Sequence, residues 1–172
     1  MSKHPPGSDL LFLRDEELLK GIELLFYAYR DFTKESDEIL RRYGYGRAHH
    51  RVLHFIGRYP NITVRELLGI LKITKQSLGR VLKQLIDDGF VDQSVGIQDR
   101  RQRQHALSQL GLELERSLSA PQRSRVAKAY NGAGADAVAG YCKVLLGLID
   151  SADRAFVQEA LSGKGFRPRR AS

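Results

Sequence analysis

Residues 63–89 read TVRELLGILKITKQSLGRVLKQLIDDG, and this stretch decides the fold. Thr63 is followed three residues later by Glu66, which is the spacing of a capping box. In a capping box each of the two side chains satisfies a free backbone donor in the first turn of a helix. The apolar residues that follow recur at helical spacing. The pattern therefore predicts a short helix over residues 63–70.

A second helix follows after a very short turn. Thr74 is a good N-cap residue, and the helical pattern that it opens continues to residue 88. The turn between the two helices covers only residues 71–73, the length of a helix-turn-helix corner. We therefore expect a helix-turn-helix with residues 74–88 as its second helix.

The second helix has two chemically different faces. Its buried face is predicted to consist of Leu78, Val81, Leu82, Leu85 and Ile86. The residues facing away from the core are donors and small groups, with no acid before Asp87. This arrangement suits a helix that enters the major groove of DNA. An ordinary solvated face is the alternative, but the short turn and the two caps favour DNA reading. The predicted DNA contacts on this helix are Lys75, Gln76, Ser77, Arg80 and Lys83.

A β-hairpin with a basic tip is predicted directly after this helix. The sequence pattern predicts two strands, Phe90–Val95 and Gln104–Leu107, with the polar loop 96–103 between them. Arginines at such a tip can reach an adjacent minor groove. The predicted contacts are Arg100, Arg101 and Arg103. Asp99 is expected to orient a neighbouring arginine by a charge-assisted hydrogen bond, although it could also simply form the turn.

Helices are predicted on both sides of this region. A long helix from Asp15 to about Tyr43 has an apolar stripe wider than one contact face needs. A long helix after Ser108 is expected to kink or restart at Pro121. A loop at 131–134 and a final apolar helix at 135–161 complete the prediction.

The fold class is therefore mainly α with a small β-hairpin wing. The predicted domains are a winged helix-turn-helix at 45–107, a discontinuous helical dimerisation domain at 10–44 and 108–162, and flexible termini at 1–9 and 163–172.

Charge is concentrated in the middle of the chain. Residues 45–107 contain 11 basic and five acidic residues, a net charge of +6, whereas 1–44 carries −2 and 108–162 is neutral. A basic segment between neutral or acidic flanks suggests a part that binds polyanions.

Cys142 is the only cysteine and no apolar run is long enough to span a membrane, so we expect a cytoplasmic protein with no membrane partner.

Two motifs are similar to those of a known family. The run 99–111, DRRQRQHALSQLG, resembles the MarR family signature of Asp-x-Arg, five residues, Leu, Ser or Thr, two residues and Gly. The preceding run 85–91, LIDDGFV, is similar to the family's exit from the recognition helix. The resemblance extends over about residues 10–162. A short helix is predicted at about 47–58, and the run 46–53 at its start departs from the family pattern because it lacks the common Leu-Thr start.

The resemblance implies a homodimeric transcription regulator that binds a palindromic operator in double-stranded DNA. It implies that the first helix and the last two helices intertwine into the dimerisation domain. Arg101 would be the wing-tip arginine, Asp99 its orienting partner, and Ser77 with Arg80 the pair that faces the groove. Family members often bind a small aromatic or phenolic effector where the two domains meet. The pocket candidates in this chain are Tyr29, Thr33, His50 and His54.

Other functions have weaker support in the sequence. His50 and His54 are four residues apart and share a helix face, but a metal site needs further ligands, so neither a metal nor a cofactor is expected. Cys142 would be the sensor of a redox-controlled protein, although a thiol in an apolar helix is more often inert. A winged helix that binds proteins instead of DNA is the main alternative, and the wing arginines argue against it. No nucleophile–base pair or phosphate loop suggests an enzyme.

Overall fold

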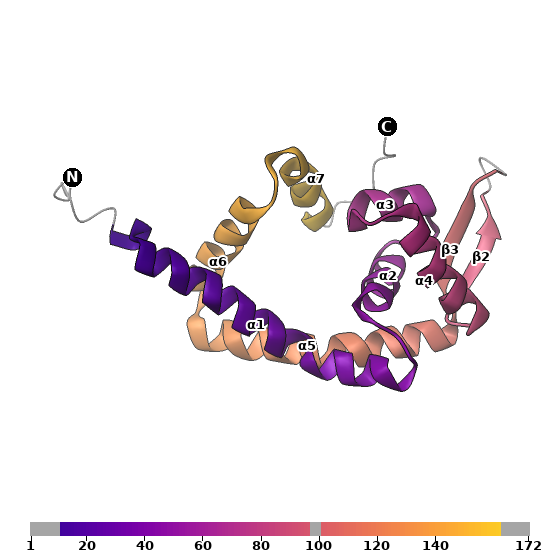
Figure 1. The fold of residues 1–172 in the computed structure, drawn as a ribbon, viewed down its shortest axis with the longest axis horizontal. Coiled ribbons are helices and arrows are strands. Elements are labelled where there is room, and N and C mark those ends of the chain that lie inside the picture. The colour runs from indigo at the N-terminus through magenta and orange to yellow at the C-terminus, as the bar shows by residue number, and fades with distance from the viewer. Residues whose placement is uncertain (1–10, 97–100, 163–172) are drawn as a thin grey trace. The chain divides into compact units, whose positions relative to one another are not determined.

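The computed structural model describes residues 11–96 and 101–162, and its centre is a winged helix (Figure 1). The three helices of this part are α2 (Arg47–Arg58), α3 (Val64–Leu71) and α4 (Lys75–Asp87). Its strands are β1 (Ile62–Thr63), β2 (Val91–Val95) and β3 (Arg103–Leu107), in the order β1-β3-β2 and antiparallel throughout. The helices and the hairpin predicted for this part of the chain are confirmed, and so is the fold class. The two-residue strand β1 was not predicted.

One apolar core holds the winged helix together. Leu53 of α2, Leu67 of α3 and Leu78 of α4 are each 0% exposed. Leu114 and Leu118 of the long helix α5 (Gln109–Ala133) belong to the same core. Each helix thus buries one stripe, and the opposite face of α4 stays exposed.

The predicted N-caps define where helices α3 and α4 begin. The Thr63 hydroxyl accepts a hydrogen bond from the Glu66 backbone N–H, and the Glu66 carboxylate accepts one from the Thr63 N–H at 2.8 Å. The Thr74 hydroxyl accepts from the Ser77 N–H at 3.1 Å. Lys72, in the turn between α3 and α4, adopts the left-handed conformation with φ of 51°. The capping box and the short corner are therefore confirmed.

The C-terminal helices differ from the prediction in three respects. Helix α5 continues through Pro121 without restarting, and the predicted loop at 131–134 is reduced to Gly134, whose φ is +83°. The single final helix is wrong, because the structure has α6 (Ala135–Leu148) and α7 (Ser151–Leu161). The Arg154 guanidinium donates to the carbonyls of Ile149 and Gly147, both at 2.8 Å, and so satisfies the end of α6.

The chain divides into two compact units, and the division falls after Glu35. The first unit contains a short 3-10 helix, Leu11–Leu13, and most of α1 (Asp15–Arg42). Many of its large apolar side chains are exposed: Leu11, Phe12, Leu13, Leu18, Leu19, Ile22, Leu24, Leu25, Phe26, Tyr27 and Tyr29. Within 11–96 and 101–162, no helix is both long and apolar enough to cross a membrane.

A buried histidine lies at the centre of the small sheet. His105 of β3 is 1% exposed and faces Ile62 of β1 and Gln93 of β2. Its Nδ1 is 3.2 Å from the Ile62 carbonyl, so Nδ1 carries the proton and donates it. Its Nε2 then accepts from the Gln93 amide at 3.1 Å. Burial lowers the pKa of His105, because the imidazolium would lose its hydration in this site.

We expect Gly111→Ala to lower the free energy of unfolding by about 3 kcal/mol, the upper range for overpacking. A Cβ at this position would overlap the Phe90 carbonyl oxygen and lie 3.3 Å from the Leu107 Cβ. Gly79→Ala is the control, because nothing lies within 4 Å of its Cβ, and it should stabilise α4 by about 0.5–1 kcal/mol. Urea unfolding at fixed protein concentration measures both. Equal effects of the two variants would contradict the close approach at Gly111.

The sheet should lose stability in mild acid. The pKa values of His105 and His50 are both lowered in the folded state, so below about pH 6.5 the unfolded chain takes up protons that the folded chain does not. The free energy of unfolding should therefore fall as pH falls from 7 to 5. His105→Asn keeps a donor for the Ile62 carbonyl and should flatten this fall, measured by urea unfolding at each pH. His54→Asn, at an exposed position, removes only the charge that helps to lower the pKa of His50, so it should flatten the fall less than His105→Asn does. Equal flattening by both variants would exclude the assignment to His105.

Candidate nucleic-acid interface

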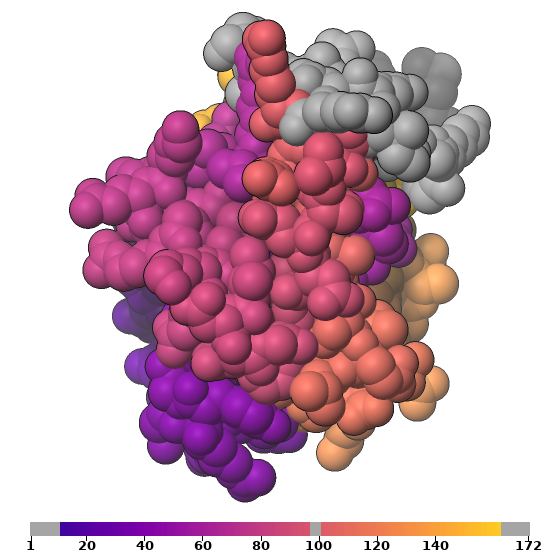
Figure 2. Space-filling view, turned by 90° about the vertical axis from the view of Figure 1, so that its right-hand side faces the viewer, coloured from indigo at the N-terminus to yellow at the C-terminus, as the bar shows by residue number. Residues whose placement is uncertain are grey.

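The outer face of α4 is the first part of the candidate interface. Four residues of the predicted buried face, Leu78, Val81, Leu82 and Leu85, are at most 8% exposed, and the fifth, Ile86, is half-buried against the same core. Ser77 is half-buried. The remaining outward residues are exposed: Lys75, Gln76, Gly79, Arg80 and Lys83. Lys83 forms an ion pair with Asp87, one helical turn further on. The face of the molecule that contains α4 also contains the hairpin strands (Figure 2).

The hydroxyl of Ser77 is prepared to donate outward. The Thr74 hydroxyl donates to the Ser77 Oγ at 2.9 Å, so the hydrogen of the Ser77 hydroxyl remains available for another acceptor. Ser77 and Arg80 line the same hollow, of about 280 Å³, together with His49 and Gln84. The two residues that the family resemblance places in the groove thus lie side by side.

His49 joins α2 to the recognition helix. Its Nδ1 accepts a hydrogen bond from the Gly46 backbone N–H at 3.1 Å, and its ring stacks on Tyr45 with a centroid distance of 4.5 Å. Since Nδ1 is an acceptor, the neutral imidazole carries its proton on Nε2. Nε2 lies 3.0 Å from the Gln84 Oε1 and donates to it. The Gln84 NH2 group is then left to donate elsewhere.

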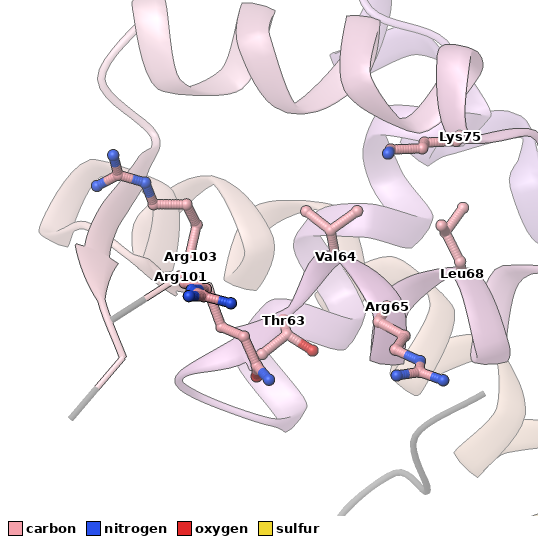
Figure 3. Close-up of a pocket in the computed structure, with 8 residues that line it drawn as sticks. Thr63, Val64, Arg65, Leu68, Lys75, Arg101 and Arg103 are labelled. Atoms are coloured by element: carbon pink, nitrogen blue, oxygen red, sulfur yellow. The ribbon is translucent and has the colours of Figure 1, made fainter. Parts of the chain in front are cut away.

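A basic cleft between α3 and the wing is the second part of the interface. Its volume is about 530 Å³, and among the residues of 11–96 and 101–162 its lining includes Arg65, Lys75, Arg101 and Arg103 but no acidic side chain. In Figure 3 the two wing arginines lie on one side of Val64, with Lys75 on the other side. Positive charges on both walls of a cleft attract a polyanion.

The structure brings together residues that the sequence treated separately. Lys75 of the helix and Arg101 and Arg103 of the wing share one cleft. The predicted residues Asp99 and Arg100 lie outside the described residues. The sequence analysis missed Arg65 and Gln84. Arg65 directly follows the first residue of α3, so its exposed position at the start of the helix could have been predicted from the sequence. The orientation of Gln84 depends on His49 of another helix, which the sequence of α4 does not indicate.

The four effector candidates fall in different units of the chain. Tyr29 and Thr33 lie in the first unit, where the Thr33 hydroxyl donates to the Tyr29 carbonyl at 3.0 Å. His50 and His54 lie on α2, and burial followed by the charge of His54 lowers the pKa of His50. The His54 Nδ1 is 3.5 Å from the Glu115 carboxylate.

The metal and redox alternatives both depend on how the His, Cys, Asp and Glu side chains are placed. Over residues 11–96 and 101–162, no three His, Cys, Asp or Glu side chains are grouped so as to hold a metal ion. Cys142 lies exposed on α6.

Comparisons with known proteins agree with this geometry. The MarR family model matches residues 43–102. The HTH-type transcriptional regulator PetP of Rhodobacter capsulatus is 53% identical over 154 residues, covering 90% of this chain and 93% of that protein.

Solved structures show the same fold. FabT of Streptococcus pneumoniae in complex with DNA has a TM-score of 0.67 at 21% identity and covers 76% of this chain and 94% of its own. A MarR mutant from Escherichia coli complexed with operator DNA has a TM-score of 0.58 at 22% identity and covers 81% and 98%. The extent and identity of the match to PetP decide the family: this chain belongs to the MarR family of transcription regulators.

Proposed function

We propose that this transcription regulator binds double-stranded DNA as a homodimer, with α4 in the major groove and the wing in the adjacent minor groove. The observation that carries the proposal is the outer face of α4, where Lys75, Ser77 and Arg80 face away from the core and no acid precedes Asp87. The basic cleft continues the same charge from α4 to the wing. A protein-binding winged helix has no need of this continuous basic surface.

The relatives support the same activity. PetP, which matches nearly the whole chain, is named as an HTH-type transcriptional regulator. FabT and the MarR mutant were both solved in complex with DNA, the mutant with its operator. We infer that this chain acts on DNA in the same general way, and that no catalytic activity is involved.

The interface residues are proposed to have separate roles. Ser77 and Arg80 lie at the base edges, where a bidentate arginine reads guanine. Lys75 and Arg65, at the cleft, contact phosphates, as do Gln76 and Lys83 along the flanks of α4. Arg101, with Arg100 and Arg103, enters the minor groove, and Asp99 orients the wing.

The exposed apolar surface supports a homodimer. The first unit exposes a run of large apolar side chains along α1, and α6 exposes Tyr141, Val144 and Leu148. Runs of exposed large apolar side chains mark interaction sites. A two-fold dimer would read a palindrome whose half-sites lie about one helical turn apart, roughly 10–10.5 base pairs from centre to centre. A small aromatic or phenolic effector is proposed to modulate this complex.

The protein should bind selected palindromic duplexes with a strong salt dependence. Each neutralised phosphate adds about −0.9 to the slope of log K against log salt, so Lys75→Ala should reduce the slope by about 2 in a dimer. Arg80→Ala should instead relax base preference, at about 1–3 kcal/mol per half-site. Binding to a panel of single-base operator variants at several salt concentrations separates the two effects. Proportional losses at every variant for both substitutions would exclude base reading by Arg80, and salt-independent binding would exclude the proposed function.

Gln84 should contact DNA only in the orientation that His49 imposes. Gln84→Ala and His49→Phe are each expected to weaken DNA binding by about 1 kcal/mol per half-site, the usual worth of one hydrogen bond. The double variant should lose no more than Gln84→Ala alone, since His49 acts through Gln84. His49→Gln restores a donor for the Gln84 Oε1 and should recover much of the affinity. Additive losses in DNA binding, with urea unfolding measured alongside, would show that His49 acts only on the stability of α2.

A further inference from the structure

The hydrogen bonds around His49 determine which group of the Gln84 amide faces outward. The Gly46 backbone N–H donates to the His49 Nδ1 at 3.1 Å, so the proton of the neutral imidazole is on Nε2. The His49 Nε2 lies 3.0 Å from the Gln84 Oε1 and donates to it. A glutamine amide has an oxygen that accepts and an NH2 group that donates. In Gln84 the oxygen is turned toward α2, and the NH2 group remains for a ligand.

Contacts with Tyr45 hold the His49 ring in this orientation. The two rings stack with a centroid distance of 4.5 Å and an interplanar angle of 1°. Tyr45 is only 5% exposed, and its hydroxyl donates to the Asp88 carboxylate at 2.6 Å. Asp88 directly follows the last residue of α4. The imidazole that orients Gln84 is therefore positioned from the end of the helix that carries Gln84.

Gln84 lies on the part of α4 that is proposed to read bases. It lines the hollow of about 280 Å³ together with Ser77 and Arg80. Gln84 follows Arg80 by four residues, so the two side chains share one face of the helix. One helical turn advances about 5.4 Å and one base pair about 3.4 Å, so two side chains one turn apart meet base pairs one or two steps apart.

Guanine and adenine differ in what they offer to an NH2 group. In the major groove guanine presents two adjacent acceptors, N7 and O6, whereas adenine presents the N7 acceptor beside the N6 amino donor. A glutamine whose oxygen and NH2 group both face the base pairs with adenine, because Oε1 accepts from N6 while the NH2 group donates to N7. With its oxygen turned toward His49, Gln84 loses this pairing. Its NH2 group then meets two acceptors on guanine but an opposing donor on adenine.

We propose that His49 makes Gln84 a reader of guanine instead of adenine, at one base pair in each half-site of the operator. The inference rests on the proposed function, because it requires α4 to lie in the major groove. Gln84 contacts the base, and His49 is a positioning residue that acts through Gln84. The side chain of Gln84 taken alone would indicate adenine, and its partner on α2 changes that reading.

The test uses the full chain and a symmetric duplex selected from random DNA. Each base pair is replaced in both half-sites at once by the other three, and the Kd of every duplex is measured. At one position the wild type should prefer guanine over adenine by about five-fold per half-site, the worth of one hydrogen bond. Gln84→Ala should lose this preference and keep the preferences at the other positions. Gln109→Ala, which removes an amide at the start of α5 and outside the hollow, is the matched control and should keep every preference.

His49→Phe tests the positioning role. The phenyl ring can still stack on Tyr45 but has no donor, so the Gln84 oxygen is released. At the same position the preference should then reverse to adenine, by about five-fold per half-site. His49→Gln can donate to the same oxygen and should restore the preference for guanine. Urea unfolding of each variant shows whether it is folded, and Gln84→Ala tests the contact independently of any change at position 49.

The outcomes separate this inference from the proposed function. A contact of Gln84 with phosphate would make Gln84→Ala weaken binding to every duplex by the same factor, and this would overturn the inference. A wild type that prefers adenine, or a guanine preference that His49→Phe leaves unchanged, would also overturn it. All three results leave the proposed function standing, because base reading by Arg80 is measured on the same duplexes. Failure to select any duplex would overturn the proposed function and this inference together.

Discussion

The fold depends on the close approach of the start of α5 to the backbone at Phe90. The Ser108 hydroxyl caps α5 by accepting from the Gly111 N–H at 3.0 Å, and it donates to the Gly89 carbonyl at 2.7 Å. The Ser108 N–H also donates to the Phe90 carbonyl, at 3.1 Å. Only glycine at position 111 leaves space for this carbonyl. The end of the recognition helix, the hairpin and the long helix α5 are thereby joined at one point, and the Leu–Ser–x–x–Gly part of the signature is the sequence of this joint.

Contacts at both of its ends hold α4 in a fixed position, and its outer face with it. At its N-terminal end Thr74 caps α4, and at its C-terminal end the Tyr45 hydroxyl donates to the Asp88 carboxylate at 2.6 Å. Burial and this carboxylate raise the pKa of Tyr45, so the hydroxyl keeps its proton as a donor. The Tyr45 ring also stacks on His49, which in turn holds Gln84. A short stretch at the start of α2 therefore fixes both the position of α4 and the orientation of one of its outward side chains.

Features with local causes could be predicted from the sequence, and features that need distant partners could not. The N-caps Thr63, Thr74 and Ser108 act within three residues, so the first residues of α3, α4 and α5 could be predicted from the sequence. The break between α6 and α7 depends on Arg154 reaching back to two carbonyls, and the two residues of β1 are too few to show a period. The basic cleft was predicted only in part, since the approach of Arg65 to the wing arginines is a product of the folded hairpin.

Helix α7 is weakly packed, and this has a physical consequence for how easily it moves. A helix without a buried side chain gains little from the hydrophobic effect, so its position depends on a few contacts such as the Lys72–Asp153 ion pair. An exposed ion pair contributes only about 0–1 kcal/mol, which is small compared with the binding energy of a small ligand. Any contact of comparable energy can therefore shift α7 without unfolding the core, whereas the same energy applied to α4, whose inner face is 0–8% exposed, would be resisted by the whole winged helix. Sensitivity at α7 and rigidity at α4 are thus two consequences of how unevenly apolar burial is distributed along the chain.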